Sequence, residues 1–81
     1  MRRLRRLYNI AERLEEKGFD YQINVDTSTG TFIEHWRKDE MYFRRHYGVL
    51  TAWKGTTLAV CTNIFHLPNN YIEALDYIES L

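Results

Sequence analysis

Hydrophobic residues recur every three or four positions at both ends of the chain, which predicts an amphipathic helix at each end. The first helix is expected over residues 2–17, and Gly18 should end it, because glycine adopts the left-handed conformation of a helix C-terminus without a side-chain clash. The second is expected from residue 71 onward, after turn formers at residues 67–70. The apolar face of the first helix comprises Leu4, Leu7, Tyr8, Ala11 and Leu14.

Between these helices the pattern changes to that of strands. Residues 19–25 alternate apolar and polar side chains, the period of a strand with one dry and one wet face. We expect this strand at or near a sheet edge. Residues 26–31 collect turn formers, with Gly30 suited to a left-handed position, and they predict a hairpin loop into a second strand. The dry face of the first strand would carry Phe19, Tyr21, Ile23 and Val25.

Residues 31–47 allow two interpretations. As strands, residues 31–38 and 41–47 would turn at Asp39 and Glu40, and Gly48 would bend the chain into the next strand. As a helix over residues 32–47, the segment would begin with a capping box and end at Gly48. The strand interpretation is favoured because the segment follows a clear strand and a turn and is rich in aromatic residues.

Residues 48–65 contain two runs of β-branched and aromatic residues on either side of Gly55, which predicts a tight hairpin at the centre of the sheet. Neither face of the second run is clearly polar, so both faces should need cover. Two short helices on one side would leave the other side bare. The residues then in need of a partner would be Leu50, Ala52, Cys61 and Phe65, or their neighbours in the opposite register.

Together these elements predict an α+β fold that forms a single domain over residues 1–81. One antiparallel sheet of about four strands in meander order would carry the N- and C-terminal helices packed on one face, in the order α-β-β-β-β-α. If residues 32–47 are helical instead, the order becomes α-β-α-β-β-α.

The composition of the chain limits its expected partners and cellular compartment. Lys plus Arg and Asp plus Glu number 11 each, so no net charge steers the chain toward nucleic acid. The single cysteine, Cys61, cannot form an intrachain disulfide, which fits a reducing, cytoplasmic compartment. No apolar run reaches the roughly 20 residues of a membrane span, and the N-terminus lacks the apolar core of a signal peptide. We expect no membrane contact.

Motifs of catalysis or metal binding are missing from the sequence. The glycines are isolated, so no phosphate-binding loop is present. His35, His46, His66 and Cys61 lack the short spacing of zinc ligands. Cys61 in an apolar strand is also a poor nucleophile. We therefore expect no enzymatic activity, no metal and no small-molecule cofactor.

Residues 35–47 interleave aromatic rings with cationic side chains. Such a segment suits protein interfaces and nucleic-acid surfaces alike, unless its aromatic residues simply fill the core. Four basic and three acidic residues between Glu34 and Arg45 leave a local charge of only +1, which favours a protein partner. The candidate contact residues are Trp36, Arg37, Lys38, Tyr42, Arg44, Arg45, His46 and Tyr47.

Four arginines crowd the start of the first expected helix, where positive charge opposes the helix dipole. They are either solvated there or contact an anionic partner, such as a phosphate backbone or an acidic protein patch. These candidate anion contacts are Arg2, Arg3, Arg5 and Arg6.

The leading expectation is a small non-enzymatic module that works by protein–protein contact, with another protein, with a second copy as a homodimer, or with both. Short chains without catalytic motifs are often regulators or inhibitors, including phage-encoded inhibitors of host defence proteins. The alternative is an RNA- or DNA-binding domain, in which the N-terminal arginines and the basic residues of 35–47 contact phosphates.

Overall fold

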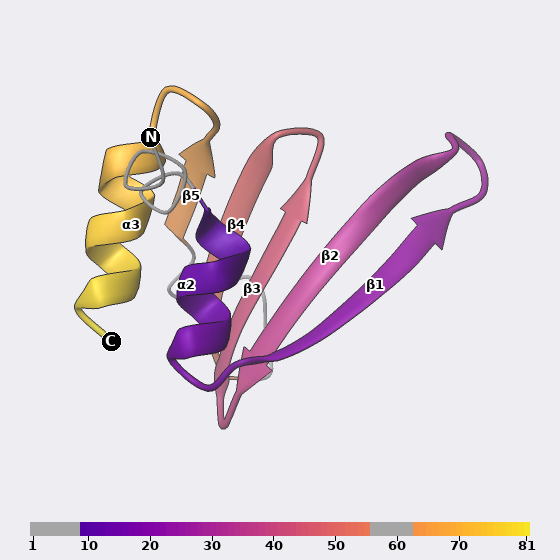
Figure 1. Ribbon diagram of the computed structural model, residues 1–81. Helices are drawn as coiled ribbons and strands as arrows, with labels where there is room; N and C mark the ends of the chain where they lie inside the picture. The colour runs from indigo at the N-terminus through magenta and orange to yellow at the C-terminus, as the bar shows by residue number, and fades with distance from the viewer. Residues whose placement is uncertain (1–8, 56–62) are drawn as a thin grey trace.

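In the computed structural model, which describes residues 9–55 and 63–81, five strands form one antiparallel sheet and two helices lie on one of its faces (Figure 1). The strands are neighbours in the order in which they follow along the chain. The described elements are α2 (Ile10–Glu16), β1 (Asp20–Asp26), β2 (Thr31–Lys38), β3 (Met41–His46), β4 (Val49–Lys54), β5 (Asn63–His66) and α3 (Tyr71–Glu79).

The expected α+β fold and its meander are confirmed, with five strands in place of about four. The helical alternative for residues 32–47 is wrong, because this segment forms β2 and β3. Two turns with left-handed backbone interrupt it: Asp39 has φ 54°, and Tyr47 and Gly48 have φ 54° and 71°. Paired positive φ values match the right-handed twist of a two-residue hairpin, so this geometry favours strand pairing over a continuous helix.

Local contacts explain both ends of α2. The Asn9 side chain accepts a hydrogen bond from the backbone N–H of Glu12 at 2.9 Å, which satisfies one free donor at the N-terminus. At the other end Gly18 has φ 89°, and the Phe19 N–H bonds the Leu14 carbonyl at 3.1 Å. The expected stop at Gly18 is confirmed. The expected helical start over residues 2–8 lies outside the described residues.

The core lies between the two helices and the middle of the sheet. Its helical members are Ile10 and Leu14 of α2, with Ala74, Leu75 and Ile78 of α3. Its largest sheet members, Trp36 and Phe43, come from β2 and β3. Because buried apolar area is the main favourable term in folding, this cluster is what holds the helices on the sheet.

The hairpin of residues 49–65 differs from the expectation in three ways. It forms β4 and β5 at one edge, and β3 is the central strand of the described sheet. Ala52 lies opposite Asn63, so the tight turn centred on Gly55 is wrong. Leu50 and Ala52, the residues named first as needing a partner, are fully buried beneath the helices, and their neighbours in the opposite register face away from the helices. Cys61 lies outside the described residues.

At the other edge, β1 and β2 form a long hairpin that extends away from the helices (Figure 1). The helices lie over the part of the sheet nearer β5. Neither described helix has the length and apolarity needed to cross a bilayer.

Candidate functional site

Residues 35–47, the segment that interleaves aromatic and cationic side chains, lie on two strands. Because side chains of a strand alternate, this segment places residues on both faces of the sheet. Trp36 and Phe43 belong to the core and therefore point toward the helices. Their neighbours Arg37, Tyr42 and Arg44 point to the opposite side, because successive side chains of a strand alternate. No helix among the described residues covers this second side, which we call the open face. It comprises Asp20, Gln22, Asn24, Asp26, Thr31, Ile33, His35, Arg37, Tyr42, Arg44, His46, Val49, Thr51, Trp53, Ile64 and His66.

A cationic and aromatic row crosses the open face. Arg37, Tyr42 and Trp53 lie opposite one another on β2, β3 and β4. The Tyr42 and Trp53 rings stack with centroids 5.4 Å apart and an interplanar angle of 10°. The Arg37 guanidinium carbon lies 5.6 Å from the Tyr42 ring centroid, within the range of a cation–π contact. These contacts hold three flat groups in one line.

Beside this row the open face is hollowed. The hollow has a volume of about 330 Å³, and its polar lining comes from Gln22, Asn24, His35 and Arg37. Burial lowers the pKa of His35 and the nearby Arg44 charge lowers it further, so its imidazole is neutral at neutral pH. The hollow therefore offers two amides and a neutral imidazole, each able to donate and accept hydrogen bonds.

Folding separates the charges that cancel along the sequence. Arg37 and Arg44 lie on the open face, whereas Glu34 and Arg45 pair on the helix side. No carboxylate belongs to the open face of β2, β3 or β4, all of whose residues are described. The nearest acidic residues on that side are Asp20 and Asp26, at the two ends of β1. Over β1 to β4, the open face therefore carries two arginines and two aspartates, and Asp20 lies directly opposite Arg37.

Glu34 is the centre of a polar cluster on the helix side. It accepts hydrogen bonds from Arg45 Nε at 2.7 Å, from Arg45 Nη2 at 3.0 Å and from Tyr21 Oη at 2.8 Å. The Arg45 guanidinium also lies 5.3 Å from the centroid of Trp36, which is only 1% exposed. Arg45 therefore stabilises the fold, and Trp36 offers no surface to a partner.

The remaining candidate residues are dispersed. Lys38 donates a hydrogen bond to the Lys17 carbonyl at 2.6 Å. His46 Nε2 lies 3.1 Å from Thr31 Oγ1, and its ring packs at 4.2 Å on Tyr47, which is 64% exposed in its turn. Of the eight predicted contact residues, the structure thus brings Arg37, Tyr42 and Arg44 together. The four N-terminal arginines lie outside the described residues.

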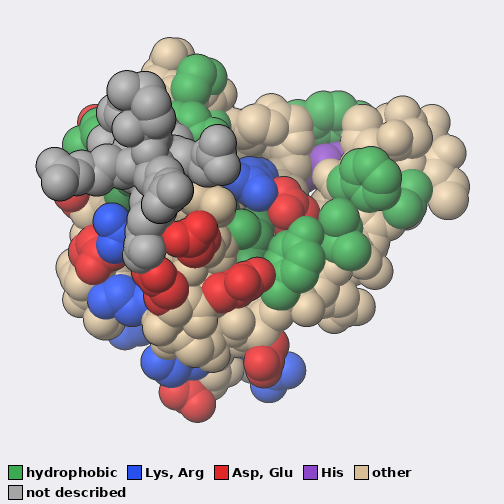
Figure 2. Space-filling view, in the orientation of Figure 1, with side chains coloured by type: hydrophobic (Ala, Val, Ile, Leu, Met, Phe, Trp, Pro, Cys, Tyr) green, Lys and Arg blue, Asp and Glu red, His purple; other side chains and the backbone are tan. Residues whose placement is uncertain are grey.

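A second surface was not anticipated from the sequence. On the helix side of the β1–β2 hairpin, four large apolar side chains are exposed to solvent: Tyr21 by 42%, Ile23 by 49%, Val25 by 55% and Phe32 by 62%. Val25 lies directly opposite Phe32. Figure 2 shows hydrophobic side chains gathered over this hairpin. We call these four residues the arm patch.

The arm patch corrects an expectation. The sequence predicts that Phe19, Tyr21, Ile23 and Val25 share one dry face of the first strand. The alternation is as predicted, but of these four residues only Phe19 is buried. Tyr21, Ile23 and Val25 lie farther along the hairpin, beyond the reach of the helices (Figure 1). Periodicity shows that a strand has an apolar face, but it carries no signal of whether another element covers that face.

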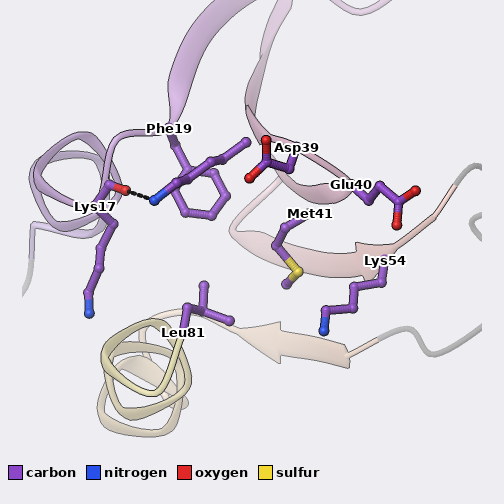
Figure 3. Close-up of a pocket in the computed structure, with 8 residues that line it drawn as sticks. Lys17, Phe19, Asp39, Glu40, Met41, Lys54 and Leu81 are labelled. Atoms are coloured by element: carbon purple, nitrogen blue, oxygen red, sulfur yellow. Dashed lines mark hydrogen bonds between the residues drawn. The ribbon is translucent and has the colours of Figure 1, made fainter.

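A third feature is a pocket of about 480 Å³ between the end of α2, the β2–β3 turn and the C-terminal residue (Figure 3). Phe19, Met41 and Leu81 supply its apolar lining. Its charged lining has both signs, from three lysines and from Asp39 and Glu40. Lys38 already donates a hydrogen bond to the Lys17 carbonyl. This mixture of charges favours no particular class of ligand.

Comparisons of the chain with protein-family models, curated proteins and solved structures give no match. Within the described residues, no group of three or more His, Cys, Asp or Glu side chains could hold a metal ion. The geometry of the open face and the arm patch therefore carries the functional argument.

Proposed function

We propose that this chain is a small non-enzymatic protein-binding module of the regulator or inhibitor type, which acts in the cytoplasm through protein–protein contact. The observation that supports this proposal is the arm patch, four adjoining large apolar side chains that are each more than two-fifths exposed. Contiguous apolar surface rimmed by polar groups is typical of protein interaction sites, because each Å² removed from water contributes about 25 cal/mol.

We assign a second copy of the chain as the occupant of the arm patch. None of its four residues is charged, so two copies facing each other bring no like charges together. The nearest carboxylate, Glu34, is neutralised by Arg45 at 2.7 Å. A two-fold interface uses the same surface on both subunits, and an apolar patch is complementary to itself. A chain of this size also gains stability from additional buried area.

The test compares two substitutions that are matched in chemistry and exposure. Ile23→Asp places a charge in the arm patch, whereas Ile72→Asp places the same charge on α3 at a position that is 48% exposed, against 49% for Ile23. In sedimentation velocity over a wide concentration range, the wild type and Ile72→Asp should form dimers. Ile23→Asp should remain monomeric, because the free energy needed to bury an unpaired carboxylate exceeds the free energy gained from the apolar contact.

A wild type that stays monomeric at every concentration would overturn the assignment of a second copy. Equal dimerisation of all three proteins would show that the interface lies away from the arm patch. Circular dichroism of both variants controls for folding.

A further inference from the structure

We propose that the outer edge of β1 binds an extended segment of a partner protein, which adds a further strand to the sheet. This inference rests on the proposed protein-binding function and specifies the form of the partner, but it does not depend on the dimer at the arm patch. The class of partner follows from three features of β1: its free backbone, its alternating side chains and the carboxylates at its two ends.

The free backbone is the first feature. Consecutive residue pairs join Asp20–Asp26 to β2 without a bulge, and within residues 9–55 and 63–81 no strand pairs with the outer side of β1. Every second residue of such an edge strand directs its backbone N–H and C=O groups away from the sheet. Proteins commonly protect an edge with proline, lysine or a bulge, and β1 has none of these. A polypeptide backbone is the partner that matches this row of donors and acceptors.

The edge is also accessible. The β1–β2 hairpin extends away from the helices (Figure 1). The residues of β1 from Asp20 to Val25 are all exposed, and Asp26 is half-buried. An added strand therefore needs no rearrangement of the described elements.

The alternating side chains are the second feature, and they define the two sides of the partner segment. Tyr21, Ile23 and Val25 lie on the helix side, whereas Gln22 and Asn24 lie on the open face. A strand added at this edge places its own side chains on the same two faces, beside these rows. Apolar residues at every second position of the segment would extend the arm patch, and polar residues between them would adjoin the two amides.

The carboxylates are the third feature, and they distinguish a segment of another protein from a second copy of β1. Asp20 and Asp26 both lie on the open face, at the two ends of the strand. Arg37 lies opposite Asp20, but neither aspartate forms a salt bridge with a described residue. Two copies of β1 paired antiparallel over their full length would set Asp20 opposite Asp26 at both ends, and like charges directly opposite are destabilising. A segment with a basic residue at each end would instead pair with both carboxylates.

The test uses an acetylated and amidated peptide, Lys-Val-Thr-Ile-Thr-Val-Lys, whose sequence reads the same in both directions and so fits either strand orientation. The peptide is titrated into isotope-labelled protein, and amide hydrogen exchange is followed by NMR. At a peptide concentration about ten times Kd, exchange should slow about tenfold at alternate residues of β1, those whose N–H groups point away from β2. The other β1 amides should change little, because they already bond to β2.

Two modified peptides separate edge pairing from binding at a face. One is N-methylated at its second, fourth and sixth residues, and the other at its third and fifth residues. These two sets of N–H groups point to opposite edges of the added strand, so one peptide should lose binding and the other should bind like the parent peptide.

Charge variants test the role of the carboxylates. A peptide with glutamate in place of both lysines should bind the wild type at least about fivefold more weakly than the parent peptide. This difference should disappear in the double variant Asp20→Asn, Asp26→Asn. The matched control is Glu73→Gln, Asp76→Asn, which neutralises two exposed carboxylates of α3 and should retain the difference.

Three results would overturn the inference. The first is the absence of binding up to the solubility limit of the parent peptide. The second is binding that both N-methylated peptides retain, because the contact would then involve a face of the sheet and not its edge. The third is protection of the outward β1 amides that appears without peptide and grows with protein concentration, which would assign the edge to a second copy. Peptide binding by a protein that sediments as a monomer would support the inference and overturn only the assignment of a second copy to the arm patch.

Discussion

Glu34 shows how one side chain can connect the two parts of the molecule. It lies on β2 where the covered part of the sheet gives way to the arm patch, opposite Ile23 on one side and Arg45 on the other. Burial alone would raise the pKa of its carboxyl group. The hydrogen bonds from Arg45 and Tyr21, together with the Arg45 charge, outweigh burial and lower the pKa below its usual range.

This pKa shift predicts how stability depends on pH. Glu34→Gln should lower the free energy of unfolding by about 1–3 kcal/mol at neutral pH, because it weakens hydrogen bonds to a charged group. A lowered folded-state pKa stabilises the fold above the unfolded carboxyl pKa of about 4.3, and the stabilisation is lost as the pH falls through the folded value. The difference between wild type and variant in urea denaturation should therefore shrink in acid.

Glu40→Gln is the control for this measurement, since Glu40 is an exposed carboxylate in the β2–β3 turn. It should change the free energy of unfolding little at any pH. A Glu34→Gln effect that is constant from neutral to acidic pH would contradict the role assigned to the charge.

At the scale of elements, the α2 terminus fixes where β1 begins. Gly18 has φ 89°, and the next residue, Phe19, is already in the core. A Cβ atom at position 18 would lie 3.5 Å from Lys38 Nζ, an ordinary van der Waals distance. Any penalty for a larger residue at this position therefore comes from the backbone and not from crowding.

Gly18→Ala should accordingly lower the free energy of unfolding by about 1–2 kcal/mol, the cost of a left-handed conformation for a residue with a Cβ atom. Gly18→Asn should cost less, because asparagine tolerates this conformation. Urea denaturation followed by circular dichroism measures both. Equal costs for alanine and asparagine would mean that crowding, and not φ, decides the effect.

At the scale of the whole molecule, two short helices face five strands within residues 9–55 and 63–81. The described helices contain 7 and 9 residues, and they cover the sheet from its middle toward β5. The β1–β2 hairpin and the entire open face receive no helix among the described residues. Among the described residues, the sheet therefore has apolar surface that its helices do not cover. This surface includes the arm patch and also Ile64 of β5, which is 57% exposed.

The two tryptophans lie on opposite sides of the sheet, so their fluorescence distinguishes the helix-covered side from the open face. Trp36 is buried under the helices, whereas Trp53 is only half-buried on the open face. Trp53→Phe should therefore leave blue-shifted emission that resists acrylamide quenching. Trp36→Phe should leave red-shifted, readily quenched emission, and it should also destabilise the fold because it alters the core. The opposite order of quenching would mean that the helices cover the other side of the sheet.

The elements and their order could be predicted because they depend on local chemistry. Alternation defined the strand over residues 19–25, Gly30 and Gly48 marked turns, and Gly18 marked the end of a helix, since each depends on neighbours in sequence. The choice between helix and strand for residues 31–47 was close, because both periods place aromatic residues on one face. Strand pairing with β1 and β4 settled it.

The sequence by itself determined the antiparallel meander, the two terminal helices and a stretch in which aromatic and cationic residues alternate. Only the tertiary structure decided which side of the sheet the helices cover and how far along the sheet they reach. These choices moved Trp36 into the core, gathered Arg37, Tyr42 and Arg44 on the open face, and exposed the arm patch. The physical reason is that alternation gives every strand two faces, but contacts between residues distant in sequence select the one that is buried.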